Sequence, residues 1–340
     1  MPNLKRSFDN PIIKPRKGVW WERESTFNPG VIKDGDEIKM LYRAVGDDFV
    51  SRLGYASSLD GINFSRFSDL PVFEPDPRNQ FETLGCEDPR IAKIGDTYYI
   101  TYCGASLNSP IKSGVKVSPF AGSGVSWRVR VSMARTGDFK HFERFGAILP
   151  DFDSKDAALF PEKIQDRYFL LHRIWPDINL ASSSDLKNWE NHQVIMSPRE
   201  GLWDCRNIGA GTVPVKTPRG WLIIYHGVDY NLVYRLGIVV LDLMNPEKVI
   251  YRSSEPIMSP EREFERSGHI KNVVFTCGMV EKDGQFYIYY GAADSCIGVA
   301  TVDKNKLLHE IAGQIRAKHR RLLPIPSLIN FLGSRFNGKN

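Results

Sequence analysis

"LGCEDPRIAKIGDTYYITYCGAS", residues 84–106, combines an apolar run, a Gly95-Asp96 turn and an aromatic-rich run that ends in small residues. Isoleucine, threonine and tyrosine favour extended backbone, and a Gly/Asp pair between two such runs is typical of a β-hairpin. Glu87, Asp88 and Arg90 crowd together just before the aromatic half of this hairpin. In isolation these three charges would indicate no more than a charged turn at the surface.

The same hairpin plan recurs along the chain. Each copy has an apolar run, a polar turn and an aromatic-rich strand, and the copies cover residues 27–46, 87–106, 159–175, 211–229 and 272–294. A second unit has a strand, an Asp-centred turn and another strand, at residues 55–67, 132–145 and 180–192, with looser copies at 239–253 and 298–310. Two hairpins make a four-stranded sheet, so the sequence predicts an all-β chain folded as a five-bladed β-propeller. Helical periodicity is almost absent before the tail, which disfavours a parallel α/β fold.

The C-terminal tail differs in charge from the rest of the chain. Residues 304–340 contain eight Lys or Arg residues and a single acid, Glu310, whereas the whole chain has a net charge of +5. The preceding residues are therefore slightly acidic, which argues against a nucleic-acid-binding face. We predict a propeller catalytic domain at 1–303 and a basic, helical tail at 304–340 that packs on the domain or on another protomer of a homo-oligomer. A basic amphipathic helix that contacts a membrane or an acidic partner is the alternative.

Several other classes are excluded by what the sequence lacks. The first 18 residues have no apolar core of a secretory signal, and no apolar run is long enough to span a bilayer. The five cysteines are widely spaced, which predicts a reduced, cytoplasmic protein without a disulfide framework. Neither a metal-ligand spacing nor a phosphate-cradling glycine loop with its lysine stands out, so we expect no metal.

A propeller would gather polar residues at one mouth of its ring, because the first strand of each blade lines the central channel. Four repeats have a proline at positions that we align with one another, each after a different residue: Asn28-Pro29, Asp88-Pro89, Phe160-Pro161 and Val213-Pro214. Such divergence on a common frame indicates a site in which each blade has its own role. Acids beside Arg, Lys and His residues suit a reaction that needs a proton donor and a bound anion.

Five motifs carry a resemblance to one enzyme family. They are "GCEDPRI" (85–91), "KDAALFPEKI" (155–164), "IGAGTVPVKTPRGWLIIYHGVD" (208–229), "YRLG" (234–237) and "YYGAAD" (289–294). From about Asn28 to Val302 the chain resembles glycoside hydrolase family 130, the β-mannoside phosphorylases and related β-mannosidases. The resemblance implies a five-bladed propeller and reversible, inverting phosphorolysis of a β-mannoside, of the manno-oligosaccharide or mannosyl-glucose type. The products would be α-mannose 1-phosphate and a shortened sugar, with inorganic phosphate as co-substrate and no cofactor.

The resemblance also implies roles for individual residues. Asp88 would be the catalytic general acid, whose proton reaches the glycosidic oxygen through a hydroxyl of the sugar. The residues that match substrate-binding positions are Asn28, Arg43, Glu87, Arg90, Asp156, Phe275 and Asp294. Those that match phosphate-binding positions, or are further candidates for them, are Arg135, Lys163, Arg173, Arg206, His226 and Tyr234.

Two other functions stay open at this point. A β-mannosidase needs a second carboxylate to activate water, which Glu162 or another acid could supply, whereas a phosphorylase needs a cationic pocket that positions phosphate. The family resemblance favours the phosphorylase, because this chain has Arg206 and His226 where the hydrolytic members have acids. The third candidate is a non-catalytic carbohydrate-binding propeller. The linkage (β-1,2, β-1,3 or β-1,4) and the acceptor sugar depend on loop shape, and residues 104–131 are either a cover over the site or a variable surface loop.

Overall fold

The fold is described by a computed structural model that covers residues 4–107 and 127–322. Its helices are the 3-10 turn η1 (Trp20–Glu22), the single turn α1 (Glu263–Arg266) and the C-terminal α2 (Lys304–Leu322). All other regular elements of the described residues are strands. The predicted all-β class is therefore confirmed. The middle of the segment 104–131, proposed as a cover over the site, lies outside the described residues.

The largest sheet joins two of the predicted repeat units. Its first half has β2 (Ser25–Asp34), β3 (Glu37–Val45), β4 (Ser51–Ser58) and β5 (Ser65–Arg66). Its second half has β6 (Gly85–Ile94), β7 (Thr97–Leu107), β8 (Trp127–Thr136) and β9 (Glu143–Ala147). The halves are joined by a parallel pairing of Ser51 with Gly85, while all other pairs in the sheet are antiparallel.

Three smaller antiparallel sheets follow along the chain. One has β10 (Lys155–Leu159), β11 (Tyr168–Ile174), β12 (Asp177–Ser183) and β13 (Glu190–Met196). The next has β14 (Asn207–Ala210), β15 (Val215–Thr217), β16 (Gly220–Val228), β17 (Tyr234–Leu241) and β18 (Val249–Arg252). The last has β19 (Val274–Lys282), β20 (Gln285–Ala292) and β21 (Cys296–Asp303), and the N-terminal β1 (Lys5–Arg6) pairs with β21 as its fourth strand.

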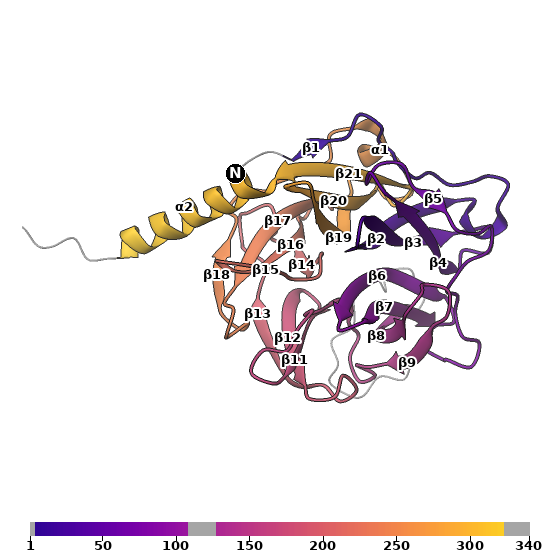
Figure 1. The fold of residues 1–340 in the computed structure, drawn as a ribbon, viewed down its shortest axis with the longest axis horizontal. Coiled ribbons are helices and arrows are strands. Elements are labelled where there is room, and N and C mark those ends of the chain that lie inside the picture. Colours follow the sequence, from indigo (N-terminus) through magenta and orange to yellow (C-terminus); the bar gives the residue numbers. More distant parts are fainter. Residues whose placement is uncertain (1–3, 108–126, 323–340) are drawn as a thin grey trace, which may run out of the picture.

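The sheets surround a common centre in the order of the sequence (Figure 1). The first strands of successive hairpins lie on the inner side and contact one another: β2 contacts β6, β6 contacts β10, and β10 contacts β14. The circuit returns through β19, which contacts both β16 and β2. Residues at the start of these inner strands are therefore brought together from distant parts of the chain.

The Asp-centred turns between the outer strands are confirmed. In each, one carboxylate oxygen accepts two backbone N–H bonds from the residues two and three positions later, as at Asp60, Asp138, Asp185 and Asp242. This arrangement closes a tight turn with the chain's own side chain. The looser copy at 298–310 is wrong as a strand–turn–strand, because helix α2 begins directly after Asp303 and β1 supplies the missing strand.

The apolar core fills the space between neighbouring sheets rather than one central cluster. The fully buried Trp221 of β16, for example, meets Phe160 edge-on at a ring-centroid distance of 5.2 Å. Each sheet thus packs on both neighbours through aromatic and branched side chains, which stabilises the arrangement of the sheets by burial of apolar surface.

Helix α2 confirms the helical part of the tail prediction. Leu307 and Ile311, one helical turn apart, are buried together with Ala312, and the helix contacts β18 and β21. Its C-terminal end extends away from the sheets (Figure 1). Residues 323–340 of the predicted basic tail lie outside the described residues. The division of the chain at residue 304 and the homo-oligomer both stay predictions.

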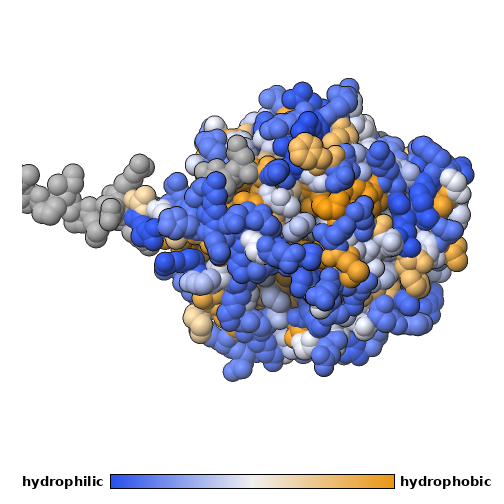
Figure 2. Space-filling model, turned by 45° about the horizontal axis from the view of Figure 1, so that its top comes forward, coloured by the Kyte–Doolittle hydropathy of each residue, from blue (hydrophilic) through white to orange (hydrophobic). Residues whose placement is uncertain are grey.

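The surface is mainly hydrophilic, with separate hydrophobic patches on the face that Figure 2 shows. Within the described ranges, none of the helices has the length and apolar character that a membrane crossing requires.

Candidate active site

Three inner strands carry a bulge at the same point of their hairpins. The pairing register shifts between Phe27 and Gly30 in β2, between Glu87 and Arg90 in β6, and between Lys155 and Ala158 in β10. Within each bulge one residue has a left-handed backbone: Asn28 (φ 46°), Asp88 (φ 51°) and Asp156 (φ 56°). Asn and Asp tolerate this conformation better than most residues, and a bulge redirects its side chains. Asn28, Asp88 and Asp156 are therefore structurally equivalent residues of three repeats.

This equivalence corrects the proline alignment made from the sequence. The pair Asp156-Ala157, and not Phe160-Pro161, occupies the position of Asp88-Pro89. Pro161 comes after the end of β10, and Pro214 lies between β14 and β15. The bulge requires a residue that accepts a left-handed backbone, whereas the proline after it is dispensable, so proline was the wrong marker of the repeat.

Asp88 lies at the centre of a buried polar cluster. Its Oδ1 accepts hydrogen bonds from Asn28 Nδ2 (2.8 Å) and Arg43 Nη1 (3.1 Å). Its Oδ2 lies 3.9 Å from Lys155 Nζ. Arg43 also donates to Glu87 Oε1 through Nη2 at 2.6 Å. Two adjacent acids of β6 thus share one arginine, and side chains from three different hairpins meet at Asp88.

The charges in this cluster act differently on its three carboxyl groups. Burial alone would raise the pKa of Asp88, but Arg43, Lys155 and the Asn28 hydrogen bond outweigh it and hold the pKa below the ordinary value. For Glu87 burial prevails and raises the pKa despite Arg43. Burial and the neighbouring acids raise the pKa of Asp294 to about 6. Asp294 is thus coupled to the same charges and belongs to the same site.

Asp156 is the centre of a second, adjoining cluster. Its carboxylate lies 3.1 Å from Arg173 Nε, 3.5 Å from Arg90 Nη2 and 3.6 Å from His226 Nε2. Gly209 of β14 lies against it, because a Cβ there would come within 2.4 Å of Asp156 Oδ2. Only glycine permits so close an approach. The carboxylate is fully buried and compensates the positive charge of two arginines.

Arg90 is held by the backbone as well as by Asp156. Its Nε donates to the carbonyl of Gly211 (2.7 Å) and its Nη2 to that of Ala210 (2.8 Å). Its Nη1 donates to the carbonyl of Asp88 (3.1 Å). The side chain is almost completely buried. Arg90 therefore fixes β6 to the end of β14, beneath the two carboxylates.

His226 borders the Asp156 cluster. Its ring lies 4.5 Å from the Phe275 ring and 6.1 Å from the Tyr234 ring, between centroids. Burial lowers the pKa of His226 to about 3 although Asp156 opposes this shift, so the imidazole is neutral at pH 7. Within the described residues its buried Nδ1 has no hydrogen-bond partner. The aromatic rings of Phe275 and Tyr234 thus orient a neutral donor or acceptor at the edge of the charged cluster.

Arg206 lies at the entry to β14, beside this group. Its backbone N–H donates to Val228, the residue that pairs with Tyr234, and its Nη1 donates to Asn207 Oδ1 at 2.8 Å. The side chain is half-buried. Arg206 is therefore near Tyr234 along the strand register.

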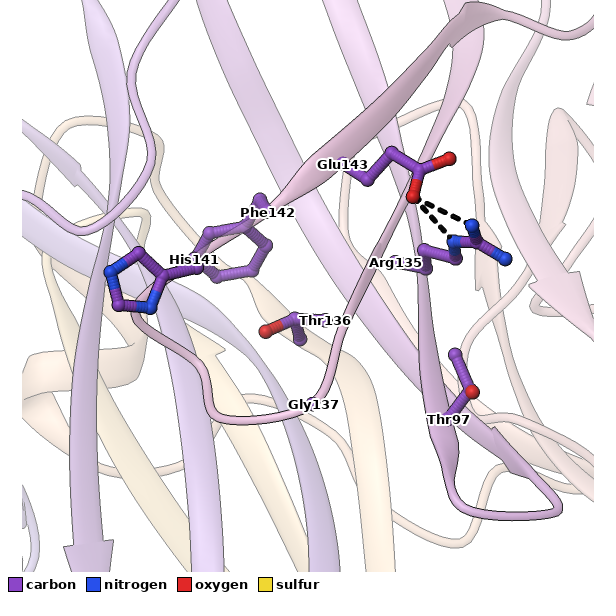
Figure 3. A pocket seen from close by; sticks show the side chains of 7 residues that line it. All are labelled: Thr97, Arg135, Thr136, Gly137, His141, Phe142 and Glu143. Atoms are coloured by element: carbon purple, nitrogen blue, oxygen red, sulfur yellow. Dashed lines mark hydrogen bonds and ion pairs between the residues drawn. The ribbon is translucent and has the colours of Figure 1, made fainter.

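Two predicted phosphate residues do not join the cluster. Arg135 pairs with Glu143 on exposed strand positions (Nη2–Oε2 2.6 Å), beside a surface hollow of about 410 Å³ near Thr97 (Figure 3). It lies opposite Tyr99, towards the turn end of the hairpin, whereas Glu87 lies opposite Cys103 at the other end. The phosphate-binding prediction for Arg135 therefore has no support from its position.

Lys163 and Glu162 are displaced for a similar reason. Both are exposed and follow the C-terminal end of β10, whereas Asp156 lies near the start of that strand. Lys163 Nζ lies over the Tyr168 ring at 4.7 Å, and Glu162 is paired with Lys216. Neither residue has a contact with the Asp88 or Asp156 cluster among those of the described residues.

Lys155 is the residue that sequence reasoning missed. Burial opposes its charge, but Asp88 and Asp156 raise the pKa of Lys155, so that it is an ammonium between the two carboxylates. The signal was available, because Lys155 precedes Asp156 as Glu87 precedes Asp88. It could be used only after the repeats were aligned on the bulge.

Asp294→Asn should stabilise the fold at neutral pH. A folded-state pKa raised to about 6 means that the ionised form is disfavoured by folding, so stability falls as pH rises through that value. We expect a gain of about 1–2 kcal/mol at pH 7.5, since one pKa unit corresponds to about 1.4 kcal/mol and partial exposure weakens the effect. Urea unfolding at pH 7.5 and pH 5 measures it, and the gain should shrink at the lower pH.

The matched control for this substitution is Asp166→Asn. Both residues have a left-handed backbone (φ 49° for Asp294 and φ 63° for Asp166), but Asp166 is exposed. It reports what the amide alone does to such a backbone. An equal gain in both variants would contradict the electrostatic explanation.

Comparison with known proteins agrees with this geometry. The family model of glycoside hydrolase family 130, described as beta-1,4-mannooligosaccharide phosphorylase, matches residues 10–312. A 1,2-beta-oligomannan phosphorylase of Thermoanaerobacter sp. (strain X514) is 43% identical over 310 residues, which are 89% of this chain and 98% of that protein. A beta-1,2-mannobiose phosphorylase of the same organism is 43% identical over 321 residues, 90% of this chain and 99% of that protein.

The fold has solved relatives as well. The structure of the beta-1,2-mannobiose phosphorylase from Listeria innocua in complex with beta-1,2-mannobiose has a TM-score of 0.77 at 28% identity. The match covers 92% of this chain and 99% of that one. The chain belongs to glycoside hydrolase family 130.

Proposed function

We propose that this protein is an inverting β-mannoside phosphorylase that converts β-1,2-linked manno-oligosaccharides and phosphate to α-mannose 1-phosphate and a shortened sugar. One observation carries the proposal: two cations lie beside the buried carboxylates of the site, Lys155 at 3.9 Å from Asp88 and Arg173 at 3.1 Å from Asp156, and such a pair can position an anion. The 43%-identical relatives with β-1,2 activities support the linkage.

For the fold, we propose a five-bladed propeller. The four hydrogen-bonded sheets correspond to five blades if the Ser51–Gly85 pairing is a contact between two of them. The successive contacts between β2, β6, β10, β14 and the last sheet support a closed circuit. In this arrangement the three bulged strands face one mouth of the central channel.

Asp88 is the proposed general acid. Although burial opposes it, the positive charge of Arg43 and Lys155 holds the pKa of Asp88 low. Phosphate bound beside Lys155 would offset that charge, raise the pKa of Asp88 and so favour its protonated form. Binding of the nucleophile would then prepare the acid, whose proton reaches the glycosidic oxygen through a sugar hydroxyl, as the family resemblance implies.

Phosphate is proposed to bind between Lys155, Arg173, Arg206 and His226, with Tyr234 beside them. Asp156 Oδ2 lies 3.1 Å from Arg173 Nε, and His226 Nε2 lies 3.4 Å from Arg173 Nη1, so the guanidinium and the imidazole are held side by side where an anion could contact both. Phosphate is already a competent nucleophile, so the site has only to position it. A base that activates water is unnecessary in this reaction.

The mannosyl unit is proposed to bind on the other side of Asp88. Asn28, Arg43, Glu87 and Asp294 supply donors and acceptors there, and Phe275, whose ring lies beside that of His226, supplies an apolar surface between the sugar and the phosphate. Arg90 and Asp156 act as buried supports of the site instead of direct sugar ligands, because Arg90 donates to two backbone carbonyls and Asp156 is ion-paired with Arg90 and Arg173.

The position of Glu162 does not support the β-mannosidase alternative, in which this residue would activate water. Glu162 is exposed and paired with Lys216, so it is not placed to activate water opposite Asp88. For location, we propose the cytoplasm: all five cysteines are free, four of them buried, which suits a reducing compartment.

Activity should depend strictly on phosphate. Incubation with β-1,2-mannobiose should release α-mannose 1-phosphate and mannose in the presence of phosphate, and nothing in its absence, because the cations position phosphate and Glu162, the base named for a hydrolase, is paired with Lys216 outside the cluster. Product analysis by NMR gives both the products and the anomeric configuration. Release of mannose without phosphate would show a hydrolase and overturn the proposal.

A matched pair of substitutions locates the anion. Lys155→Met should raise the KM for phosphate at least about tenfold, since a charge-assisted contact contributes roughly 1.5–3 kcal/mol. Arg135→Met removes a cation that lies outside the cluster, and it should leave that KM unchanged.

A further inference from the structure

Four of the five repeated hairpins share a buried polar unit behind the site. In each, a tyrosine of the second strand donates its hydroxyl hydrogen to a fully buried carboxylate that also pairs with arginine. The tyrosine–acid pairs are Tyr42–Glu22 (2.8 Å), Tyr102–Glu82 (2.6 Å), Tyr225–Asp204 (2.7 Å) and Tyr290–Glu265 (2.8 Å). The arginine partners are Arg16, Arg144, Arg199 and Arg6, respectively.

The hairpin of β10 and β11 is the exception. His172 occupies the position of the tyrosines, directly before Arg173, as Tyr42 precedes Arg43 and Tyr225 precedes His226. His172 is fully buried. Its Nδ1 lies 2.9 Å from Ser154 Oγ, and its Nε2 lies 3.2 Å from His192 Nδ1. A chain of hydroxyl and imidazoles therefore replaces the carboxylate and arginine of the other hairpins.

The donor and acceptor roles in this hydrogen-bonded series of Ser154, His172 and His192 follow from the contact that His192 makes with Trp189. His192 Nε2 lies 3.3 Å from the carbonyl oxygen of Trp189, which can only accept, so Nε2 carries the hydrogen. In neutral His192 the Nδ1 is then an acceptor, and His172 must donate to it through Nε2. His172 Nδ1 in turn accepts the hydrogen of the Ser154 hydroxyl. Every link is satisfied in a single arrangement.

The inner end of the chain lies next to the phosphate residues of the proposed function. Ser154 directly precedes Lys155, and His172 directly precedes Arg173, whose Cα pairs with that of Lys155 across the two strands. The bulge interrupts the backbone pairing between Lys155 and Ala158. The Ser154–His172 bond thus links the strands where the ladder is interrupted.

The exchange of an acid for imidazoles also changes the charge behind the site. Burial lowers the pKa of His172 to about 3, with His192 as a smaller cause, so this position is uncharged at neutral pH. A carboxylate here would compete with a bound anion for Lys155 and Arg173. The neutral imidazoles add no further negative charge to that of Asp88 and Asp156, which already face Lys155 and Arg173.

From these contacts we propose that His172 is a positioning residue, which holds Lys155 and Arg173 in the geometry that binds phosphate by tying Ser154 to His192. The proposal rests on the proposed function for the identity of the anion. The link that matters is the inner one, from Ser154 to Nδ1.

The test compares two substitutions of His172, each of which places an amide near only one of the two imidazole nitrogens. His172→Asn places its amide near the Nδ1 position and can keep the Ser154 bond, whereas His172→Gln reaches the Nε2 position and loses it. Ser154→Ala removes the inner link alone. Tyr290→Phe is the matched control, because it removes the equivalent buried bond in the hairpin where the next residue, Gly291, has no side chain.

Two measurements are made on the full chain. In the ligand-free protein, hydrogen exchange by mass spectrometry should be faster for the peptide around residues 153–160 in His172→Gln and Ser154→Ala, and unchanged in His172→Asn and Tyr290→Phe. In phosphorolysis of β-1,2-mannobiose, the first two should raise the KM for phosphate about tenfold, the equivalent of one lost hydrogen bond, with little change in the KM for the sugar.

The two measurements separate the two claims. Unchanged exchange in Ser154→Ala, or an equal rise of the phosphate KM in Tyr290→Phe, overturns the positioning role. If the wild type shows no phosphorolysis, the proposed function fails, while the exchange data still decide whether the chain fixes the segment.

Discussion

Asp88→Asn should lower kcat for phosphorolysis by about 10²–10⁴-fold, the usual contribution of a positioned general acid. Asparagine keeps the shape of the side chain, accepts the left-handed backbone at φ 51° and can still receive the Asn28 hydrogen bond, but it has no proton to give. Steady-state kinetics with saturating phosphate and mannobiose measure the loss. Activity within about tenfold of the wild type would exclude Asp88 as the acid.

The same substitution has a distinct pH signature in stability. The pKa of Asp88 is held below its ordinary value, so its ionised form stabilises the fold above the unfolded pKa, and this contribution is lost as pH falls through the folded pKa. The asparagine variant should therefore be less stable than the wild type at pH 7, and the difference should vanish in acid. This is the opposite of the gain expected for Asp294→Asn, although the two carboxyl groups share the same cations.

Asp156→Asn should destabilise the fold by about 3 kcal/mol or more, because it leaves buried arginines without their counter-charge. Arg90 and Arg173 both face this carboxylate, which is fully buried. The amide keeps the volume and the left-handed backbone, so the loss reports charge rather than packing. Urea unfolding at pH 7 is the measurement, with Asp166→Asn as control for the backbone.

Phosphate provides a second readout of the same variant. An anion bound at Arg173 would replace part of the missing charge, so added phosphate should raise the unfolding midpoint of Asp156→Asn more than that of the wild type. A loss of stability below about 1 kcal/mol would contradict the assignment of Asp156 as the counter-ion of both arginines.

The sequence was sufficient for the parts of the fold that are decided locally. The Gly95-Asp96 turn and the aromatic run after it do form the β6–β7 hairpin, and the Asp-centred turns close on their own backbone. Glu87 and Asp88 were found because they immediately precede such a hairpin. These features need only neighbouring residues to form, so pattern and family resemblance located them.

Features that depend on the register between strands could not be predicted from the hydrophobic and turn pattern of the sequence. Arg135 lies opposite Tyr99, towards the turn end of the β6–β7 hairpin and away from Glu87, and only the strand register reveals this. Lys155 was overlooked because Ala157 stands where Pro89 stands in β6, which hid the bulge. The role of Arg90 was also unpredictable, since its partners Ala210 and Gly211 lie about 120 residues away.

The pairing of β1 with β21 has a consequence for how the protein is made. Lys5 and Arg6 find their strand partners at Thr301 and Ala300, so β1 can pair only after a strand about 300 residues later has been synthesised. Arg6 also pairs with the buried Glu265, and β21 holds the strand that carries Arg6. Contacts of such sequence separation slow folding and expose intermediates to aggregation. Chains interrupted before β21 would leave β20 with an open edge and β1 without a partner, so the last sheet can be completed only after β21 has been made.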